Sequence, residues 1–261
     1  MKISATIITF NEEQKIKKCL DSLCHVADEI VVVDSFSSDQ TESICKSYDT
    51  VRFLKNRFEG HIQQKNFALD EAEYDDILSL DADECLSELL INEIQDLKSG
   101  GGRTGMAYSM PRLNNYCGQW IQHSGWYPDR KVRLWDRKIG RWGGRNPHDS
   151  VVLDRGVKIE SLRGDILHDT ISSLAAHVNQ TNKFSEIAAR QLFDAKPRTA
   201  ATFKMISDPP FTFLKRYVLQ RGFLDGFHGL TIAVISAHAK FLKYAKFKEL
   251  KSRHEDSSSK L

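Results

Sequence analysis

The chain has 261 residues, of which 41% are hydrophobic and 28% are charged. This composition is typical of a folded globular protein and excludes collagen-like, disordered and disulfide-scaffold chains. The formal net charge of +2 is unevenly distributed: residues 1–196 carry 25 Lys and Arg against 30 Asp and Glu, whereas residues 197–261 carry 12 against 5. We therefore expect no nucleic-acid partner, and the basic tail suits either an anionic membrane surface or a solvated helical face.

Five scattered cysteines without a CxxC pair indicate reduced, buried thiols in a cytoplasmic protein. The apolar stretch near the N-terminus is too short, and too soon followed by acidic residues, for a signal peptide. No apolar run reaches the roughly 18–20 residues of a transmembrane helix. The expected location is the cytoplasm, and peripheral attachment to the inner face of the plasma membrane stays open.

The first hundred residues alternate between strand and helix patterns. Short apolar runs predict four strands, at residues 5–10, 30–33, 51–54 and 77–80. The stretches between them predict helices, near residues 16–23, 40–47 and 61–72. This order predicts an α/β fold with a doubly wound, mostly parallel sheet. The run at 30–33 has no polar alternation, which is typical of a strand buried on both faces.

Polar and acidic residues follow three of these strands. The first strand runs into Asn11 and Glu12, the second into Asp34, and the fourth into Asp81-Ala82-Asp83-Glu84. In open α/β sheets ligands bind at the carboxyl ends of the strands, so these groups should converge on one ligand site. The two carboxylates of Asp81 and Asp83 suit a hard divalent cation, or one can bind the ion and the other a ribose.

The rest of the chain changes character. Residues 100–170 are rich in aromatic residues, Arg and Gly, and predict an added antiparallel hairpin with strands at 132–135 and 151–153. From about residue 171 the pattern is helical. We expect a main domain at 1–196, with one part at 1–99 and a second part at 100–196. A basic amphipathic helical extension at 197–251 and a disordered tail at 252–261 complete the predicted organisation.

Taken together, the motifs at residues 7–13, 30–41, 64–68 and 80–84 resemble those of family 2 glycosyltransferases with the GT-A fold. The segments at 126–129, 141–149 and 216–226 are similar to the branch of lipopolysaccharide core β-1,4-glucosyltransferases. The resemblance implies a hexosyltransferase that uses a nucleotide-sugar donor, most often a UDP-hexose, with Mg²⁺ or Mn²⁺ and inversion at the anomeric carbon. The implied acceptor is a glycan or lipid-linked molecule of the cell envelope. The resemblance also implies that residues 1–196 form the catalytic domain, with a nucleotide-binding part at 1–99 and an acceptor-side part at 100–196.

The resemblance also implies roles for individual residues. Thr9, Asn11 and Glu12 would line the nucleoside pocket, and Asp34 would accept a hydrogen bond from the base. Lys65 would approach the uracil or the diphosphate.

In the Asp-x-Asp motif, Asp81 would reach the ribose or the metal, and Asp83 would bind the metal, with Ala82 between them in the donor site. His148 and His168 are candidates for additional metal or phosphate contacts.

The acceptor hydroxyl needs a base to take its proton as it attacks the sugar. The candidates are Asp149, Asp129 and Glu84, and we favour Asp149 because it follows a loop rich in Gly and Arg.

Two other functions are considered. A sugar-phosphate nucleotidyltransferase would need a Gly-rich basic loop after the first strand, where this chain has Asn11-Glu12-Glu13. A non-catalytic nucleotide-sugar-binding protein would not need the Asp81 and Asp83 pair. The sequence leaves open whether the C-terminal helices bind a membrane, cover the catalytic domain or form a homodimer.

Overall fold

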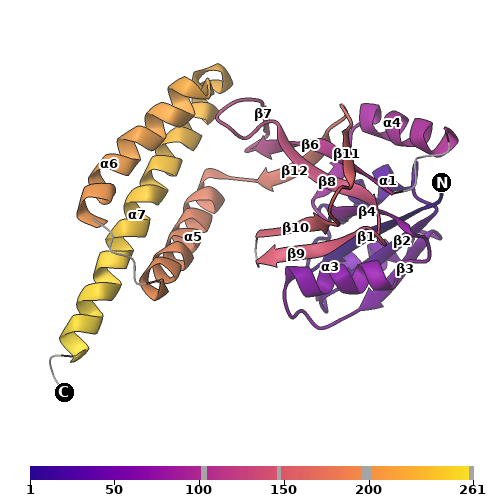
Figure 1. Ribbon diagram of the computed structural model, residues 1–261, viewed down its shortest axis with the longest axis horizontal. Helices are drawn as coiled ribbons and strands as arrows, with labels where there is room; N and C mark the ends of the chain where they lie inside the picture. The colour runs from indigo at the N-terminus through magenta and orange to yellow at the C-terminus, as the bar shows by residue number, and fades with distance from the viewer. Residues whose placement is uncertain (101–104, 146–147, 196–200, 259–261) are drawn as a thin grey trace. The chain divides into compact units, whose positions relative to one another are not determined.

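The computed structural model of the protein describes residues 1–100, 105–145, 148–195 and 201–258 (Figure 1). In chain order its elements are β1 (Ile3–Thr9), α1 (Ile16–Leu23), β2 (Glu29–Asp34), α2 (Thr41–Cys45), β3 (Val51–Lys55), α3 (His61–Asp70), β4 (Asp76–Asp81), β5 (Glu84–Leu86), α4 (Glu88–Ser99), β6 (Met106–Tyr116), β7 (Gln119–Ile121), β8 (Asp129–Asp136), β9 (Gly140–Arg145), β10 (His148–Leu153), β11 (Lys158–Ser161), β12 (Ile166–Ile171), α5 (Leu174–Asp194), α6 (Ala201–Leu214), the π-helix η1 (Lys215–Leu219), the 3₁₀-helix η2 (Gly222–Asp225) and α7 (Gly226–Ser258).

The chain divides into two compact units. Unit 1 consists of Met1–Leu113 with Pro128–Asp169, and unit 2 of Asn114–Tyr127 with Thr170–Leu261. The domain boundary expected between residues 196 and 197 falls inside unit 2. The tail expected to be disordered from residue 252 is helical as far as Ser258.

Unit 1 is built on a parallel array of strands in the order β3-β2-β1-β4. Strand β2 is buried on both faces, and its side chains alternate between two apolar clusters, one on each face of the sheet. Ile30 and Val32 pack with α1 and α4, while Val31 and Val33 pack with Ala68 of α3. The doubly wound α/β class predicted from the sequence is therefore confirmed.

The register of the parallel strands brings their carboxyl ends together. Thr9 lies beside Asp34, and Ile8 lies beside Asp81. The convergence expected of the polar residues that follow these strands is thus present in the backbone, at one edge of the sheet.

Antiparallel strands extend the sheet beyond β4. Strand β8 pairs with β4 and with β6, and β5 pairs with β12. The predicted hairpin between residues 132–135 and 151–153 is wrong, because Val151 lies opposite Trp142 in a separate two-stranded sheet of β9 and β10. Both segments are strands, but the sequence pattern does not reveal long-range partners.

Unit 2 is mainly helical, and α7 contacts both α5 and α6. Asp225 is buried in η2 and fixes the segment at residues 122–124. Its carboxylate accepts hydrogen bonds from the backbone N–H groups of Gln122 and His123 at 3.3 and 3.1 Å. The Ser124 hydroxyl donates to it at 3.2 Å, and His123 Nδ1 lies 3.0 Å from it. This carboxylate explains why residues 114–127 belong with the C-terminal helices. None of the helices within the described ranges combines the length and the apolar character needed to cross a membrane.

The core of unit 1 generates a stability prediction. Leu20 of α1 is completely buried, whereas the Leu89 side chain on α4 is 48% exposed. Leu20→Ala should lower the free energy of unfolding by about 3 kcal/mol, because it removes buried methyl groups and leaves a cavity. Leu89→Ala should change it by less than about 1 kcal/mol. Urea unfolding of both variants measures the difference, and equal effects would contradict this assignment of the core.

Candidate active site

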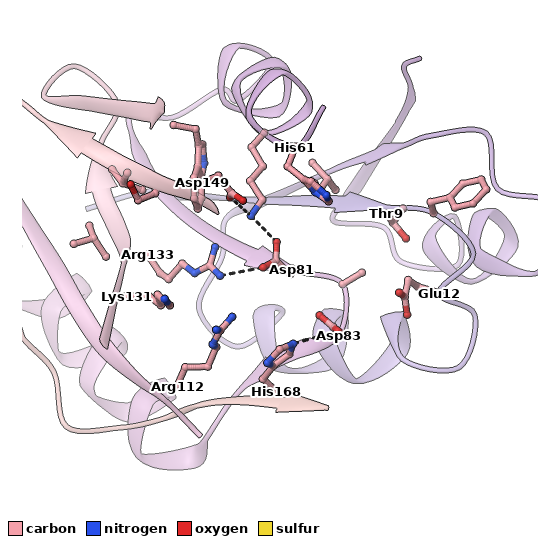
Figure 2. Close-up of a pocket in the computed structure, with 18 of the residues that line it drawn as sticks. Thr9, Glu12, His61, Asp81, Asp83, Arg112, Lys131, Arg133, Asp149 and His168 are labelled. Carbon is pink, nitrogen blue, oxygen red and sulfur yellow. Dashed lines mark hydrogen bonds and ion pairs between the residues drawn. The ribbon is translucent and has the colours of Figure 1, made fainter. Parts of the chain in front are cut away.

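A cavity of about 1220 Å³ lies at the carboxyl-end edge of β1 and β4 in unit 1 (Figure 2). Many of its lining residues carry polar side chains: Thr9, Glu12, Ser35, His61, Lys65, Asp81, Asp83, Arg112, Arg130, Lys131, Arg133, Asp149, Ser150 and His168. The cavity is therefore bordered by carboxylates, imidazoles and cations from several elements that are far apart in the sequence.

Asp81 is the centre of a buried charge network. Its Oδ1 lies 2.8 Å from Lys65 Nζ on α3, and its Oδ2 lies 3.0 Å from Arg133 Nη2 on β8. Burial alone would raise the pKa of Asp81, but the charges of Arg133 and Lys65 outweigh burial and hold this pKa well below its usual range. Asp81 therefore stays ionised and ties β4 to α3 and β8.

Lys65 continues the network to Asp149, whose Oδ2 lies 2.8 Å from the same ammonium group. Lys65 also lies over the ring of Trp142, with Nζ 4.2 Å from the ring centroid, so a cation–π contact adds to the two ion pairs. Asn66 fixes the strand that carries Trp142. Its amide donates to the Trp142 carbonyl at 2.9 Å and accepts from the Trp142 N–H at 3.1 Å. These contacts fix the β9–β10 hairpin on α3.

Glu84 is buried and is not among the residues that line the cavity. Its side chain is completely buried, and its Oε1 pairs with Arg112 at 3.2 Å and with Arg133 at 3.1 Å. Its Oε2 accepts the backbone N–H of Asp81 at 3.0 Å. With both oxygens engaged, Glu84 is placed to support Asp81 and Arg133 rather than to contact a substrate.

Asp83 and His168 form a second pair in the cavity. His168 Nε2 lies 3.3 Å from Asp83 Oδ2, and Lys15 Nζ lies 3.7 Å from the same oxygen. Burial alone would raise the pKa of Asp83, but the hydrogen bond and charge of His168 outweigh it, so this pKa is lowered. A carboxylate and an imidazole thus meet at one point of the cavity wall (Figure 2).

The residues expected to bind the nucleoside are not all in the cavity. Thr9 and Glu12 line it, and burial raises the pKa of Glu12. The Thr9 hydroxyl is buried without a hydrogen-bond partner among the described residues.

Asn11 and Asp34 are not among the lining residues. Asn11 Oδ1 accepts the Ser38 N–H at 2.8 Å. Asp34 is completely buried and accepts hydrogen bonds from the Ser37 N–H, at 2.8 Å, and from the Ser37 hydroxyl. The structure therefore places both side chains where they fix the loop that follows β2.

The remaining predicted residues are placed as follows. Ala82 lines the cavity. Asp129 does not, and it pairs with two residues that do, Arg112 at 2.7 Å and Lys131 at 3.0 Å. The His148 side chain lies outside the residues that the structure describes. Of the three candidate bases, Asp149 is the one that borders the cavity.

Sequence reasoning missed the roles of Arg133, Trp142 and Asn66. Arg133 and Trp142 lie in the segment rich in Arg and aromatic residues, so their composition was a signal. Their partners were not predictable because those partners lie on α3, β4 and β5, which are distant in the sequence.

The buried network generates a prediction with a surface control. Arg133→Met removes the buried cation that pairs with both Glu84 and Asp81 and leaves each carboxylate one cation, Arg112 or Lys65. It should cost about 3–5 kcal/mol of unfolding free energy. Arg141 pairs with Asp70 at 2.7 Å, where both side chains are more than half exposed, so Arg141→Met should cost about 1 kcal/mol or less. Chemical denaturation compares the two. If Arg133→Met is as mild as Arg141→Met, the network does not stabilise unit 1.

Comparison with known proteins identifies the family. The model of the family "Glycosyl transferase family 2" matches residues 4–163. A glycosyltransferase of Rickettsia typhi is 32% identical, over 97% of this chain and 89% of that protein. The lipopolysaccharide core biosynthesis glycosyltransferase LpsC of Rhizobium meliloti is 29% identical, over 94% and 92%. Residues 1–349 of S. aureus TarS, solved with UDP-GlcNAc, align over 98% of this chain and 92% of that one, with 14% identity and a TM-score of 0.48. The chain belongs to glycosyltransferase family 2.

Proposed function

We propose that the protein transfers a hexose from a UDP-sugar to a glycan of the cell envelope, in the lipopolysaccharide core, with inversion at the anomeric carbon and with the aid of Mg²⁺ or Mn²⁺. The proposal is supported mainly by one observation, which is that a single cavity is lined by Asp83, His168 and Asp149. Asp83 and His168 lie 3.3 Å apart, and the ion-paired Asp81 lines the same cavity. The choice of acceptor is supported by the similarity to LpsC over 94% of this chain. Membership in a glycosyltransferase family disfavours the nucleotidyltransferase and the non-catalytic alternatives.

The side-chain atoms available as metal ligands fit a divalent cation that also binds a diphosphate. Within the described part of the chain, no three His, Cys, Asp or Glu side chains are grouped to hold an ion. Asp83 Oδ2 and His168 Nε2 are 3.3 Å apart and would hold it from one side. Mg²⁺ is commonly held by one or two carboxylates, with phosphate oxygens and water completing its shell. When bound, the ion would stabilise negative charge on the departing diphosphate.

Asp81 takes a different role in this proposal from the metal contact expected of it. Both of its oxygens already face cations, Lys65 and Arg133. Asp81 therefore positions these two cations at the cavity wall. Arg133 and Lys65 both line the cavity, and their positive charges would favour the phosphate oxygens of a bound diphosphate.

Asp149 is the proposed base. It borders the cavity, unlike Glu84 and Asp129, and its Oδ2 is held by Lys65 at 2.8 Å. The acceptor hydroxyl would give its proton to Asp149 as its oxygen attacks the anomeric carbon, and the bond from that carbon to the diphosphate oxygen breaks. Lys65 fixes the orientation of the carboxylate throughout.

The metal assignment is tested by donor binding. Thermal shift against a panel of nucleotide-sugars, with and without Mn²⁺, should give a metal-dependent shift for a UDP-hexose. Asp83→Asn and His168→Ala should each weaken metal-dependent donor binding by about 10–100-fold, measured by calorimetry, because each removes one ligand. Asp70→Asn, an exposed site on α3, is the control and should leave binding unchanged. Unchanged metal dependence in both site variants would refute the assignment.

The assignment of the catalytic base is tested by comparing two of the three candidate carboxylates, Asp149 and Asp129. Asp149→Asn should lower kcat for transfer to a lipopolysaccharide-core acceptor by about 10²–10⁴-fold, because the proton of the acceptor hydroxyl loses its base. Asp129→Asn should keep kcat close to that of the unsubstituted enzyme, since Asp129 lies outside the cavity lining. The reverse order of the two kcat values would assign the base to Asp129.

A further inference from the structure

Exposed apolar side chains gather on the helices of unit 2. On α6, Phe203 and Ile206 are 70% and 67% exposed, and Leu214 is 54% exposed. With the exposed Pro210 they are spaced i, i+3, i+7 and i+11, so they share one side of the helix. This side of α6 therefore presents a continuous apolar stripe.

The stripe continues into the short helices η1 and η2 that join α6 to α7. The exposed side chains are Leu219 at the end of η1, Phe223 and Leu224 in η2, and Phe227 at the start of α7, and Leu219 reaches 72%. We call these four residues the apolar tip. The tip consists of large side chains that folding leaves in water, which is unusual for a surface without a partner.

A second stripe runs from the tip along α7. Phe227, Leu230, Val234 and Phe241 are exposed and spaced i, i+3, i+7 and i+14, so they also lie on one side of their helix. Helices α6 and α7 run side by side (Figure 1), and the tip connects their two stripes.

Cations accompany the apolar residues. Lys204 lies on α6, Lys215 and Arg221 lie at the tip, and Lys240 lies on α7; all four are exposed. Lys and Arg beside an apolar surface are typical of segments that lie on anionic lipid.

Acidic side chains are few in the same segment, and they are buried or half-buried. Between residues 201 and 248 the sequence has two acids, Asp208 and Asp225. Asp225 is buried against His123 and Ser124, and Asp208 is half-buried. The exposed charge between these residues is therefore positive throughout.

We infer that the apolar tip docks on an anionic lipid bilayer, with Leu219, Phe223, Leu224 and Phe227 entering the boundary of the acyl chains and the neighbouring cations facing the headgroups. The charge of the surface decides between this partner and a second copy of the chain. A symmetric dimer through the tip would bring Lys215 and Arg221 of one copy against the same residues of the other, with no exposed acid to compensate. Anionic headgroups supply the missing opposite charge. The inference goes beyond the proposed function and does not depend on it.

The test is flotation of the full chain with vesicles. We expect binding to vesicles of phosphatidylcholine with phosphatidylglycerol, weaker binding to phosphatidylcholine alone, and loss of binding as salt rises. Leu219→Glu combined with Leu224→Glu should weaken binding at least about tenfold, and Lys215→Gln should weaken it about fivefold. Leu89→Glu, at an exposed leucine on α4 of unit 1, is the matched control and should bind as the unsubstituted protein does.

Three outcomes would overturn the inference. They are no binding to anionic vesicles, equal binding by the tip variant and the Leu89→Glu control, or a dimer in sedimentation equilibrium that the tip variant dissociates while vesicles stay unbound. A far-UV circular dichroism spectrum and a thermal unfolding midpoint equal to those of the unsubstituted protein show that the tip variant is folded. Vesicle binding without any transferase activity would reject the proposed function and leave this inference standing.

Discussion

The ion pairs of Asp81 are the interaction on which the candidate active site depends. Asp81 ends β4 at the carboxyl edge of the parallel sheet, where other acidic residues gather. Lys65 and Arg133 reach it from α3 and β8 at 2.8 and 3.0 Å, and Glu84 and Asp149 complete the network. Because a buried charge without a partner is costly, each of these side chains constrains the others. The network therefore fixes five elements around one cavity.

The parallel part of the fold was predictable because local patterns determine it. The run at residues 30–33 is apolar on both faces, and the structure packs its alternate side chains into two clusters. The antiparallel additions were not predictable in the same way. The strand at 132–135 was recognised, but its partners β4 and β6 lie far away in the sequence. Likewise, Asp225 binds residues 122–124 across about a hundred residues, and no local pattern indicates that contact.

In the candidate site, too, local sequence patterns identified residues but not their long-range partners. The Asp-x-Asp motif after a strand identified Asp81 and Asp83, and both border the cavity. The resemblance implied a metal contact for Asp83 and a ribose or metal contact for Asp81, and the structure gives the two carboxylates different surroundings. Asp81 faces two cations, whereas Asp83 faces His168, with Lys15 farther away. Asn11 and Asp34 also follow strands, yet their side chains hold the loop at residues 35–38. Position at a strand end therefore predicts the neighbourhood of a side chain but not its partner.

The central claim is that Asp83 and His168 hold a divalent cation beside the donor diphosphate. A crystal of the protein grown with Mn²⁺ and UDP, measured for anomalous scattering from manganese, tests it most directly. The account predicts one strong manganese peak within coordination distance of Asp83 Oδ2 and His168 Nε2, with diphosphate oxygens in the same shell. A UDP bound in the cavity with manganese absent from this pair, or bound elsewhere, would contradict it.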